Sequence, residues 1–370
     1  MRHNGWIRFF FYFCLLHVDT VRGAASDAPS FAICLNGQVL RLELASKINS
    51  LFVPNLQAGY RLDVFLHLDG NVSGVKRTAF SKLEVKTYTD CSEQELQALV
   101  LNSTLSALAK VGLGNYVAGH FRVFASFATT ADHVFEIIGN KSVLPIGGDF
   151  GGAVRFQRNF AMLSLLRTCM LTLADREVRD RRFYDFVIRL RDDSLVYAPW
   201  VLRPDVYAHN LMDVGVGYDG VGGFGGVNDH TMVVDRLHAD HMFRSPLEDY
   251  YLASPESGTD QPRVLRNTEI LLFDTAKRKG VPIKLVSLCE MPTVPIGSHQ
   301  SLFWVVDSFY ADLYTKEIAA KPDVYQACHP RDWLEPRHFY MHWPDGPKQG
   351  MPESHTAHRK VVCSGRHGQG

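Results

Sequence analysis

Tyr184-Asp-Phe-Val-Ile-Arg-Leu-Arg-Asp-Asp-Ser194 is an apolar stretch that ends abruptly in two arginines and two aspartates. Its short, β-branched centre is typical of a buried strand in an α/β sheet rather than of a helix. In open α/β sheets, ligands bind just beyond the carboxyl ends of the strands. Two guanidinium groups beside two carboxylates at such a strand end suit a nucleotide diphosphate and its divalent cation. The alternative is an internal Arg–Asp ion-pair cluster that binds nothing.

The flanking sequence supplies the rest of an α/β pattern. A short apolar run at 31–35 predicts a first strand that Asn36 and Gly37 close with a tight turn. Apolar residues at helical spacing over 39–51 predict a helix, and 61–68 predicts a second strand. Strand, helix and strand in this order predict a βαβ unit with a parallel sheet.

Further elements continue the alternation towards the C-terminus. Helices are expected over 92–111, over 157–179, where the longest amphipathic stretch lies, and over 236–243. Short strands are expected at 232–235 and 283–287. The fold class is therefore α/β, with a mostly parallel central sheet between two layers of helices.

Composition limits the class of protein. The chain has 370 residues and a formal net charge of zero, so it offers no basic footprint for nucleic acid. Arg2 and Arg8 precede an apolar core at 9–18 that is about half the length needed to cross a bilayer. Residues 1–23 therefore read as a cleaved secretory signal peptide. A short uncleaved anchor is the alternative, and contact with a membrane is expected only in that case.

Cysteines and glycosylation acceptors agree with export to the ER or Golgi lumen or beyond. Removing Cys14 with the signal leaves six cysteines, an even number that permits disulfides without fixing their pairing. They lack the short CxxC pairs of a structural zinc site. Asn-x-Ser/Thr triplets begin at Asn71, Asn102 and Asn140, which predicts a glycosylated N-terminal half.

A glycine-rich stretch follows the central strand. Seven glycines fall within the twelve positions 215–226, and the candidates for phosphate contact are Gly222, Gly223, Gly225 and Gly226. Glycines let backbone amides approach phosphates closely. The stretch is neither GxGxxG nor a P-loop, and a plain flexible loop is the alternative.

These motifs, in this order over residues 30–290, resemble the GT-A glycosyltransferase fold. Within it they are similar to an uncharacterised group of eukaryotic and protist glycosyltransferase-like proteins. The features that carry the resemblance are Phe31-Ala-Ile-Cys-Leu-Asn-Gly37, Leu62-Asp-Val-Phe-Leu-His67, the 184–193 strand, Gly222-Gly-Phe-Gly-Gly-Val-Asn-Asp-His230 and Asn267-Thr-Glu269. The resemblance implies a Rossmann-type nucleotide-sugar site, to which Asn36 and Gly37 contribute, with a divalent cation at the acidic end of the central strand.

The chemistry of glycosyl transfer assigns roles to the candidate residues. Negative charge builds on the departing diphosphate, so its electrostatic stabilisation is the main demand on the protein. Asp193 and Asp192 can supply oxygen ligands to Mn²⁺ or Mg²⁺, and strand alternation favours Asp193, which shares a face with Arg189 and Arg191. The two arginines can instead grip the phosphates themselves, because this chain has Arg-x-Arg-x-Asp rather than a plain Asp-x-Asp.

A general base for the acceptor hydroxyl is required only if the anomeric configuration inverts. Asp229 is the first candidate and Glu269 the second, although a loop aspartate beside Asn228 can equally be a turn or cap residue. The motifs of zinc hydrolases and of serine hydrolases are missing from the sequence.

The sequence thus predicts a lumenal or secreted glycosyltransferase that takes a nucleotide-sugar donor and a glycan or glycoprotein acceptor. A non-catalytic, sugar-binding secretory protein with a degenerate form of the fold is the alternative. The expected division is a signal peptide at 1–23, a nucleotide-sugar-binding domain at 30–290 and a C-terminal extension at 291–370, whose last residues we expect to be disordered.

Overall fold

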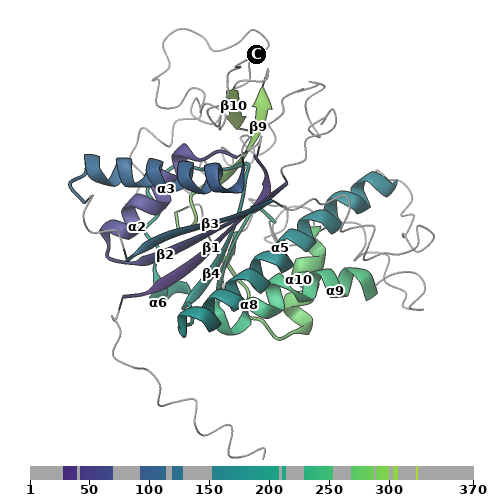
Figure 1. Ribbon diagram of the computed structural model, residues 1–370. Coiled ribbons are helices and arrows are strands. Elements are labelled where there is room, and N and C mark those ends of the chain that lie inside the picture. The colour runs from purple at the N-terminus through teal and green to yellow at the C-terminus, as the bar shows by residue number, and fades with distance from the viewer. Residues whose placement is uncertain are drawn as a thin grey trace, which may run out of the picture.

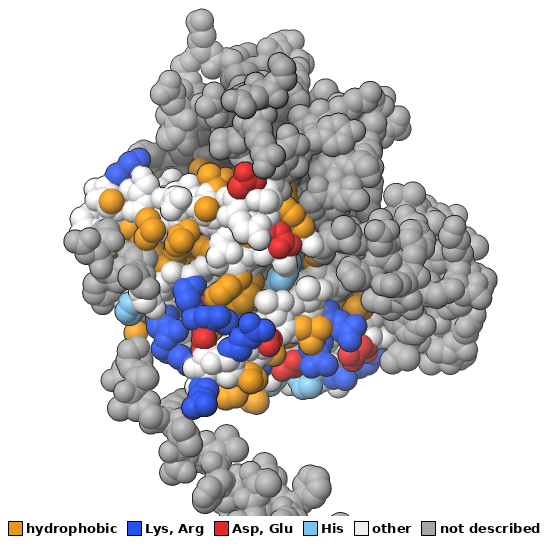
Figure 2. All heavy atoms as spheres, viewed as in Figure 1, with side chains coloured by type: hydrophobic (Ala, Val, Ile, Leu, Met, Phe, Trp, Pro, Cys, Tyr) orange, Lys and Arg blue, Asp and Glu red, His pale blue; other side chains and the backbone are white. Residues whose placement is uncertain are grey.

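The computed structural model describes residues 28–39, 42–69, 92–113, 119–127, 152–207, 211–213, 229–252, 268–286, 289–299, 303–306 and 322–323. All of the structural statements below concern these residues, whose side chains Figure 2 colours by type. The signal peptide expected at 1–23, the glycine-rich stretch, and the acceptors Asn71 and Asn140 lie outside them. No helix among the described residues is both long and apolar enough to cross a membrane.

The centre of the fold is a seven-stranded sheet with the strand order β3-β2-β1-β4-β7-β6-β8 (Figure 1). Its strands are β1 (Ser30–Gln38), β2 (Arg61–Asp69), β3 (Phe121–Phe127), β4 (Phe186–Arg191), β6 (Leu211–Asp213), β7 (Thr231–Asp235) and β8 (Lys284–Val286). β3, β2, β1 and β4 are mutually parallel, and β6 is parallel to β8, whereas β7 runs antiparallel to both of its neighbours. The predicted α/β class with a mostly parallel central sheet is confirmed.

Helices cover both faces of this sheet. On one face pack the π-helical segment η2 (Lys47–Phe52), α2 (Val53–Gln57) and α3 (Glu93–Lys110). On the other lie α5 (Gly152–Asp180), α8 (Arg236–Phe243), α9 (Ser245–Leu252) and α10 (Thr268–Arg278), as Figure 1 shows. A short helix, α6 (Pro204–Tyr207), comes after β4 and β5 (Ser194–Val196) along the chain.

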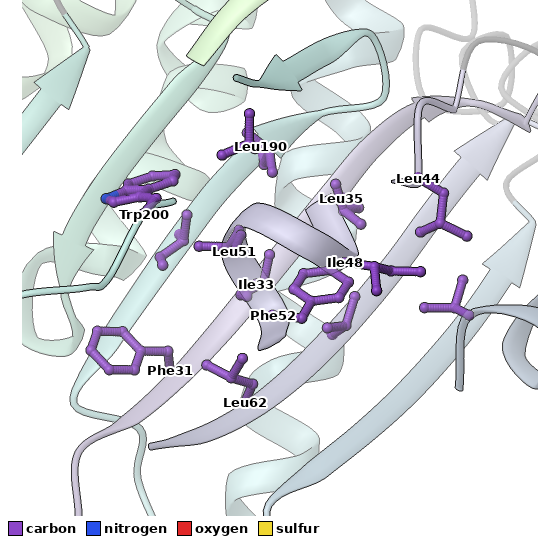
Figure 3. Close-up of a cluster of buried hydrophobic side chains, with 14 of the residues drawn as sticks. Phe31, Ile33, Leu35, Leu44, Ile48, Leu51, Phe52, Leu62, Leu190 and Trp200 are labelled. Carbon is purple, nitrogen blue, oxygen red and sulfur yellow. The ribbon is translucent and has the colours of Figure 1, made fainter. Parts of the chain in front are cut away.

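Strand alternation divides the buried side chains between two cores. Phe31, Ile33 and Leu35 of β1 belong to the core under η2, α2 and α3, which Figure 3 shows in close-up. Ala32 and Cys34 point to the opposite core under α5 and α8 to α10. Each large apolar side chain buried in this way contributes about 1.5–3 kcal/mol. The near-continuous apolar character of β1 thus follows from burial on both faces.

A disulfide joins β1 to α5. Cys34 and Cys169 are both fully buried, and they are separated by 135 residues in sequence. Cys289 is disulfide-bonded as well. The expectation that cysteines of this chain form disulfides is confirmed.

A second, smaller sheet connects the expected C-terminal extension to the rest of the fold. Its order is β10-β9-β5, formed by β5 (Ser194–Val196), β9 (Thr293–His299) and β10 (Phe303–Val306). β5 follows β4 after a two-residue turn, and it pairs antiparallel with β9. The chain just beyond residue 291 therefore lies next to the end of the central strand.

Two local predictions are wrong. The helix expected over 39–51 begins only after residue 44 and continues through α2. Glu43 N donates to Asp192 O (2.9 Å), so residues 42–44 are held against the end of β4 instead of coiling. Asn36 and Gly37 do not form a tight turn, because β1 continues through them to Gln38.

The helix predicted over 92–111 begins with a capping box. Ser92 Oγ accepts from Glu95 N, while the Glu95 carboxylate accepts from Ser92 N (2.7 Å). Asn102 lies exposed on this helix, so glycosylation there stays a prediction.

Candidate functional site

The carboxyl ends of β1 and β4 form the switch point of the sheet. From β1 the chain builds β2 and β3 on one side, and it then returns through α5 to place β4 on the other side. The connections leave β1 and β4 in opposite directions, and ligands of open α/β sheets bind in the crevice that results. Asn36, Gly37, Arg191 and Asp192 lie at this point.

A row of polar side chains crosses the sheet at this edge. The strand register aligns Ser126 of β3, His67 of β2, Asn36 of β1 and Arg191 of β4. Because Cys34 faces α5 and alternate residues share a face, the row lies on the α5 side. Asn36 Nδ2 accordingly donates to the Leu165 carbonyl of α5 (3.2 Å). The next row inward contains Phe124, Phe65, Cys34 and Arg189, so polarity increases sharply at the rim.

Arg191 joins two carboxylates at the end of β4. Its Nε and Nη2 donate to the two oxygens of Asp193 (2.9 Å each), and its Nη1 donates to Asp229 Oδ1 (3.2 Å). His230 Nε2 is 3.4 Å from the same Nη1. Burial disfavours the charged form of Arg191, but Asp193 and Asp229 outweigh it and raise its pKa. Burial also disfavours the charged form of Asp229, but Arg191 and His230 outweigh this effect and lower the pKa of the Asp229 carboxyl.

Arg189 lies one row deeper and has no exposed surface. Its Nη2 is 3.8 Å from Asp229 Oδ2 and 3.0 Å from Met162 Sδ. Its Nε and Nη1 have no hydrogen-bond partner among the described residues. Burial lowers the pKa of Arg189 to about 10, although Asp229 opposes the shift. Unpaired buried donors are costly, so this guanidinium calls for a ligand or ordered water.

Four of the residues predicted from the sequence, the two arginines with Asp193 and Asp229, come together in this cluster. Glu269, in the first turn of α10, is also near enough to favour the charged form of Arg189. The positive charges of Arg189 and Arg191 equal the negative charges of Asp193 and Asp229. Gly222, Gly223, Gly225 and Gly226 lie outside the described residues, so their part in the site stays a prediction.

Asp192 turns away from this cluster and caps β1. Its Oδ2 accepts from Gln38 N (2.8 Å), and its backbone N–H donates to Asn36 O (3.0 Å). A Cβ added to Gly37 would lie 2.1 Å from Asp192 Cγ, and the φ of Gly37 is +145°. Glycine is required at position 37 by both the backbone conformation and this close approach.

A buried lysine that we did not single out in the sequence fixes the turn after β4. Lys47 Nζ donates to the carbonyls of Glu43 (2.6 Å), Asp192 (3.2 Å) and Ser194, and it lies 3.7 Å from the Glu43 carboxylate. Lys47 and Glu43 have no exposed surface. The only signal in the sequence is an i,i+4 Glu–Lys pair, which ordinarily predicts a solvent-exposed helix face.

His67 and Ser126 form a second polar contact that we did not assign. His67 Nδ1 and Ser126 Oγ are 2.6 Å apart, and His67 Nε2 has no hydrogen-bond partner in the described part of the chain. Burial lowers the pKa of His67 to about 4, so the ring is neutral at physiological pH. It therefore offers neutral hydrogen-bonding groups beside the charged cluster.

The candidate metal ligands fit a divalent cation poorly. Both oxygens of Asp193 accept from Arg191, and Asp192 accepts from Gln38 N on the far side of Gly37. Among the described residues, no three His, Cys, Asp or Glu side chains are grouped so as to hold a metal ion. The donor set at this strand end is instead organised around a guanidinium.

No family model matches the chain, and no curated protein matches it. Among solved structures, the chain is similar to a nucleoside-diphosphate-sugar pyrophosphorylase from Vibrio cholerae at 11% identity, with a TM-score of 0.35. The match covers 72% of this chain and 94% of the bacterial one. A likeness of this strength carries no argument about function.

Proposed function

We propose that the chain binds a nucleotide sugar at the carboxyl ends of β1 and β4 and transfers its glycosyl group, as a member of the GT-A glycosyltransferase fold. One observation carries the proposal: two guanidinium groups, on alternate residues of β4 that share the face towards α5, lie at the switch point of the sheet. Arg191 lies in line with the uncharged polar side chains of Asn36 and His67, and Arg189 lies one row deeper.

The arginines suit the anionic part of such a donor. The Arg191 side chain is 22% exposed, so a ligand contacts this guanidinium first, and Arg189 lies behind it. A guanidinium has more N–H groups than the contacts of Arg191 use. Oriented cationic donors in a partly buried site stabilise the charge that develops on a departing diphosphate, and this effect is usually the largest single contribution to catalysis.

The neutral part of the row suits the hydroxyl-rich part of the donor. Asn36 Oδ1 and His67 Nε2 are both buried and lack hydrogen-bond partners among the described residues. Their register positions are adjacent on β1 and β2. A ligand that carries both phosphates and hydroxyl groups can satisfy the arginines and these two side chains together.

Asp229 and Glu269 remain the candidates for a general base. The lowered pKa of Asp229 keeps it ionised at neutral pH, as a base requires, although Arg191 already holds one of its oxygens. The acceptor we propose is a glycan or glycoprotein in the secretory pathway, in keeping with the expected signal peptide and glycosylation acceptors.

A second candidate function follows from the same contacts. Arg191 engages both Asp193, the metal ligand expected from the sequence, and Asp229, the proposed base. An ion-pair network of this kind also suits a non-catalytic protein that keeps the fold and binds a sugar without turnover.

Thermal unfolding with ligands separates the two functions. The full chain, purified from a secretory host, is heated with UDP-, GDP- and CMP-sugars, and with the free sugars. A ligand at about 100 times its Kd stabilises the native state by about 2.7 kcal/mol, which corresponds to a rise in Tm of roughly 5 °C. A rise with one nucleotide sugar supports the transferase, and a rise with free sugars alone supports the non-catalytic protein.

The matched variants are Arg189→Met and Arg203→Ala. Methionine keeps most of the volume of Arg189 without its charge, so we expect the protein to fold and to lose the nucleotide-dependent rise. Arg203 forms an exposed pair with Asp205 and serves as the control, for which the rise should remain. An unchanged rise with Arg189→Met would remove this residue from the site.

A further inference from the structure

We infer that Arg191 is a built-in cation of this site, so that the two carboxylates beside it bind no divalent metal ion in the native protein. That the ligand of Arg191 is a nucleotide sugar rests on the proposed function. That the two carboxylates bind no metal ion rests only on the geometry around Arg191.

Three side chains of the types that commonly ligate metal ions contact the guanidinium instead. Asp193 takes one edge of it through two parallel hydrogen bonds, and Asp229 and His230 meet Nη1. The side chains of Asp193, Asp229 and His230 are all less than one-tenth exposed. A carboxylate, a second carboxylate and an imidazole are the donor types that Mn²⁺ accepts, but here they converge on a nitrogen cation that belongs to the chain.

The guanidinium is fixed in this position by the strand. Arg191 is the last residue of β4, and its backbone N–H donates to the His230 carbonyl of the β7 side (3.1 Å). Two parallel N–H···O bonds to one carboxylate give an arginine a geometry that lysine cannot reproduce. A divalent ion at Asp193 would either displace the guanidinium or share the carboxylate oxygens with it, and in both cases two cations would lie side by side.

Removal of the Arg191 guanidinium should allow Asp193 and Asp229 to bind a metal ion. Without Arg191, the remaining guanidinium of Arg189, 3.8 Å from Asp229, balances only one of the two buried carboxylates, so one binds a proton or the pair binds a metal ion. Arg191→Ala also opens the volume that the side chain filled. We therefore expect a metal site in the variant where the native protein has none.

The first test measures Mn²⁺ alone, by electron paramagnetic resonance of the free ion titrated with the full chain. We expect no stoichiometric binding by the native protein and one Mn²⁺ per chain for Arg191→Ala, at least tenfold tighter. Arg191→Lys retains a charge and should stay close to the native protein. Arg203→Ala, which removes an arginine from an exposed i,i+2 Arg–Asp pair, is the control for non-specific binding. Metal-dependent melting of Arg191→Ala reports the same binding if that variant is only marginally stable.

One Mn²⁺ per native chain, lost in Asp193→Asn, would overturn the inference. So would the absence of tighter binding in a folded Arg191→Ala protein. The native measurement decides the question even if this variant does not fold.

The second test repeats the nucleotide-sugar melting experiment in EDTA and in Mn²⁺. A nucleotide-dependent rise in Tm of equal size in both supports the inference, and a rise that requires Mn²⁺ overturns it while leaving the proposed function intact. The absence of a rise under both conditions counts against the proposed function, and the Mn²⁺ titration then decides the inference by itself.

Discussion

Substituting Gly37 by alanine places a methyl group where the carboxylate of Asp192 now lies. The added Cβ would be 2.1 Å from Asp192 Cγ and from its Oδ1, well inside any contact distance. Alanine must also adopt the φ of +145°, which L-residues rarely do. The substitution therefore has two separable costs, one in the backbone and one in the side chain of Asp192.

Both costs can be assigned magnitudes from the structure. A non-glycine residue in such a backbone conformation costs about 1–3 kcal/mol. Displacing Asp192 breaks the charge-assisted hydrogen bond from Gln38 N, which contributes about 1.5–3 kcal/mol. We expect Gly37→Ala to lower the free energy of unfolding by roughly 2.5–6 kcal/mol, the sum of these two costs.

Urea denaturation of four proteins separates the two contributions: the native chain, Gly37→Ala, Asp192→Ala and the double variant. In the Asp192→Ala background the clash is gone, so Gly37→Ala should cost only the backbone portion, about 1–3 kcal/mol. Equal costs in both backgrounds would refute the reasoning, because the Asp192 carboxylate would then contribute nothing to the requirement for glycine.

Three further predictions concern buried groups. Burial lowers the pKa of His67 in the folded protein to about 4, from its ordinary value of 6.5. The unfolded chain therefore binds more protons below pH 6.5, and stability falls on acidification, by about 2 kcal/mol at pH 5. Urea denaturation between pH 5 and 7.5 should show this loss in the native protein and not in His67→Gln. Lys47→Met leaves the buried Glu43 carboxylate without its cation and should cost about 3–5 kcal/mol, measured as a shift in the urea midpoint; a cost below 1 kcal/mol would contradict that role. Replacing both Cys34 and Cys169 by alanine opens a loop of 135 residues and should lower stability by about 2–5 kcal/mol, and an unchanged melting temperature would show that the bridge constrains nothing.

The layers of the fold could be predicted from the sequence because their signals are local. The apolar run 31–35 and the stretch that ends in Arg191 are buried on both faces, and the amphipathic 157–179 has a stripe that only a helix would produce. The helix expected over 39–51 illustrates the limit. Its apolar spacing extends to Val39, but the hydrogen bond from Glu43 N to Asp192 O holds residues 42–44 out of the helix, and that contact spans about 150 residues.

The candidate site was only partly accessible to sequence reasoning, for a physical reason. Chemically unusual residues at a strand end, such as Arg191 and Asp193, are visible because burying charge is expensive. The register that brings Ser126 and His67 into line with them is set by strand pairing, which no local pattern encodes. Lys47 escaped notice because burial, rather than spacing, makes it unusual.

Lys47 and Arg191 together explain why the turn after β4 has one arrangement. Lys47 holds the backbone carbonyls of Asp192 and Ser194 against the Glu43 loop on one side of the sheet. On the other side, Arg191 links the Asp193 side chain to Asp229, which lies just before β7. Each cation binds several buried oxygens of this turn at once, so neither can be lost without disturbing it. Because Arg191 is already held in place, a ligand that binds it does not have to order this side chain, and this preorganisation favours affinity. The same rigidity leaves little freedom for Asp193 to leave the guanidinium and bind a metal ion. For this reason we expect the native protein not to bind Mn²⁺.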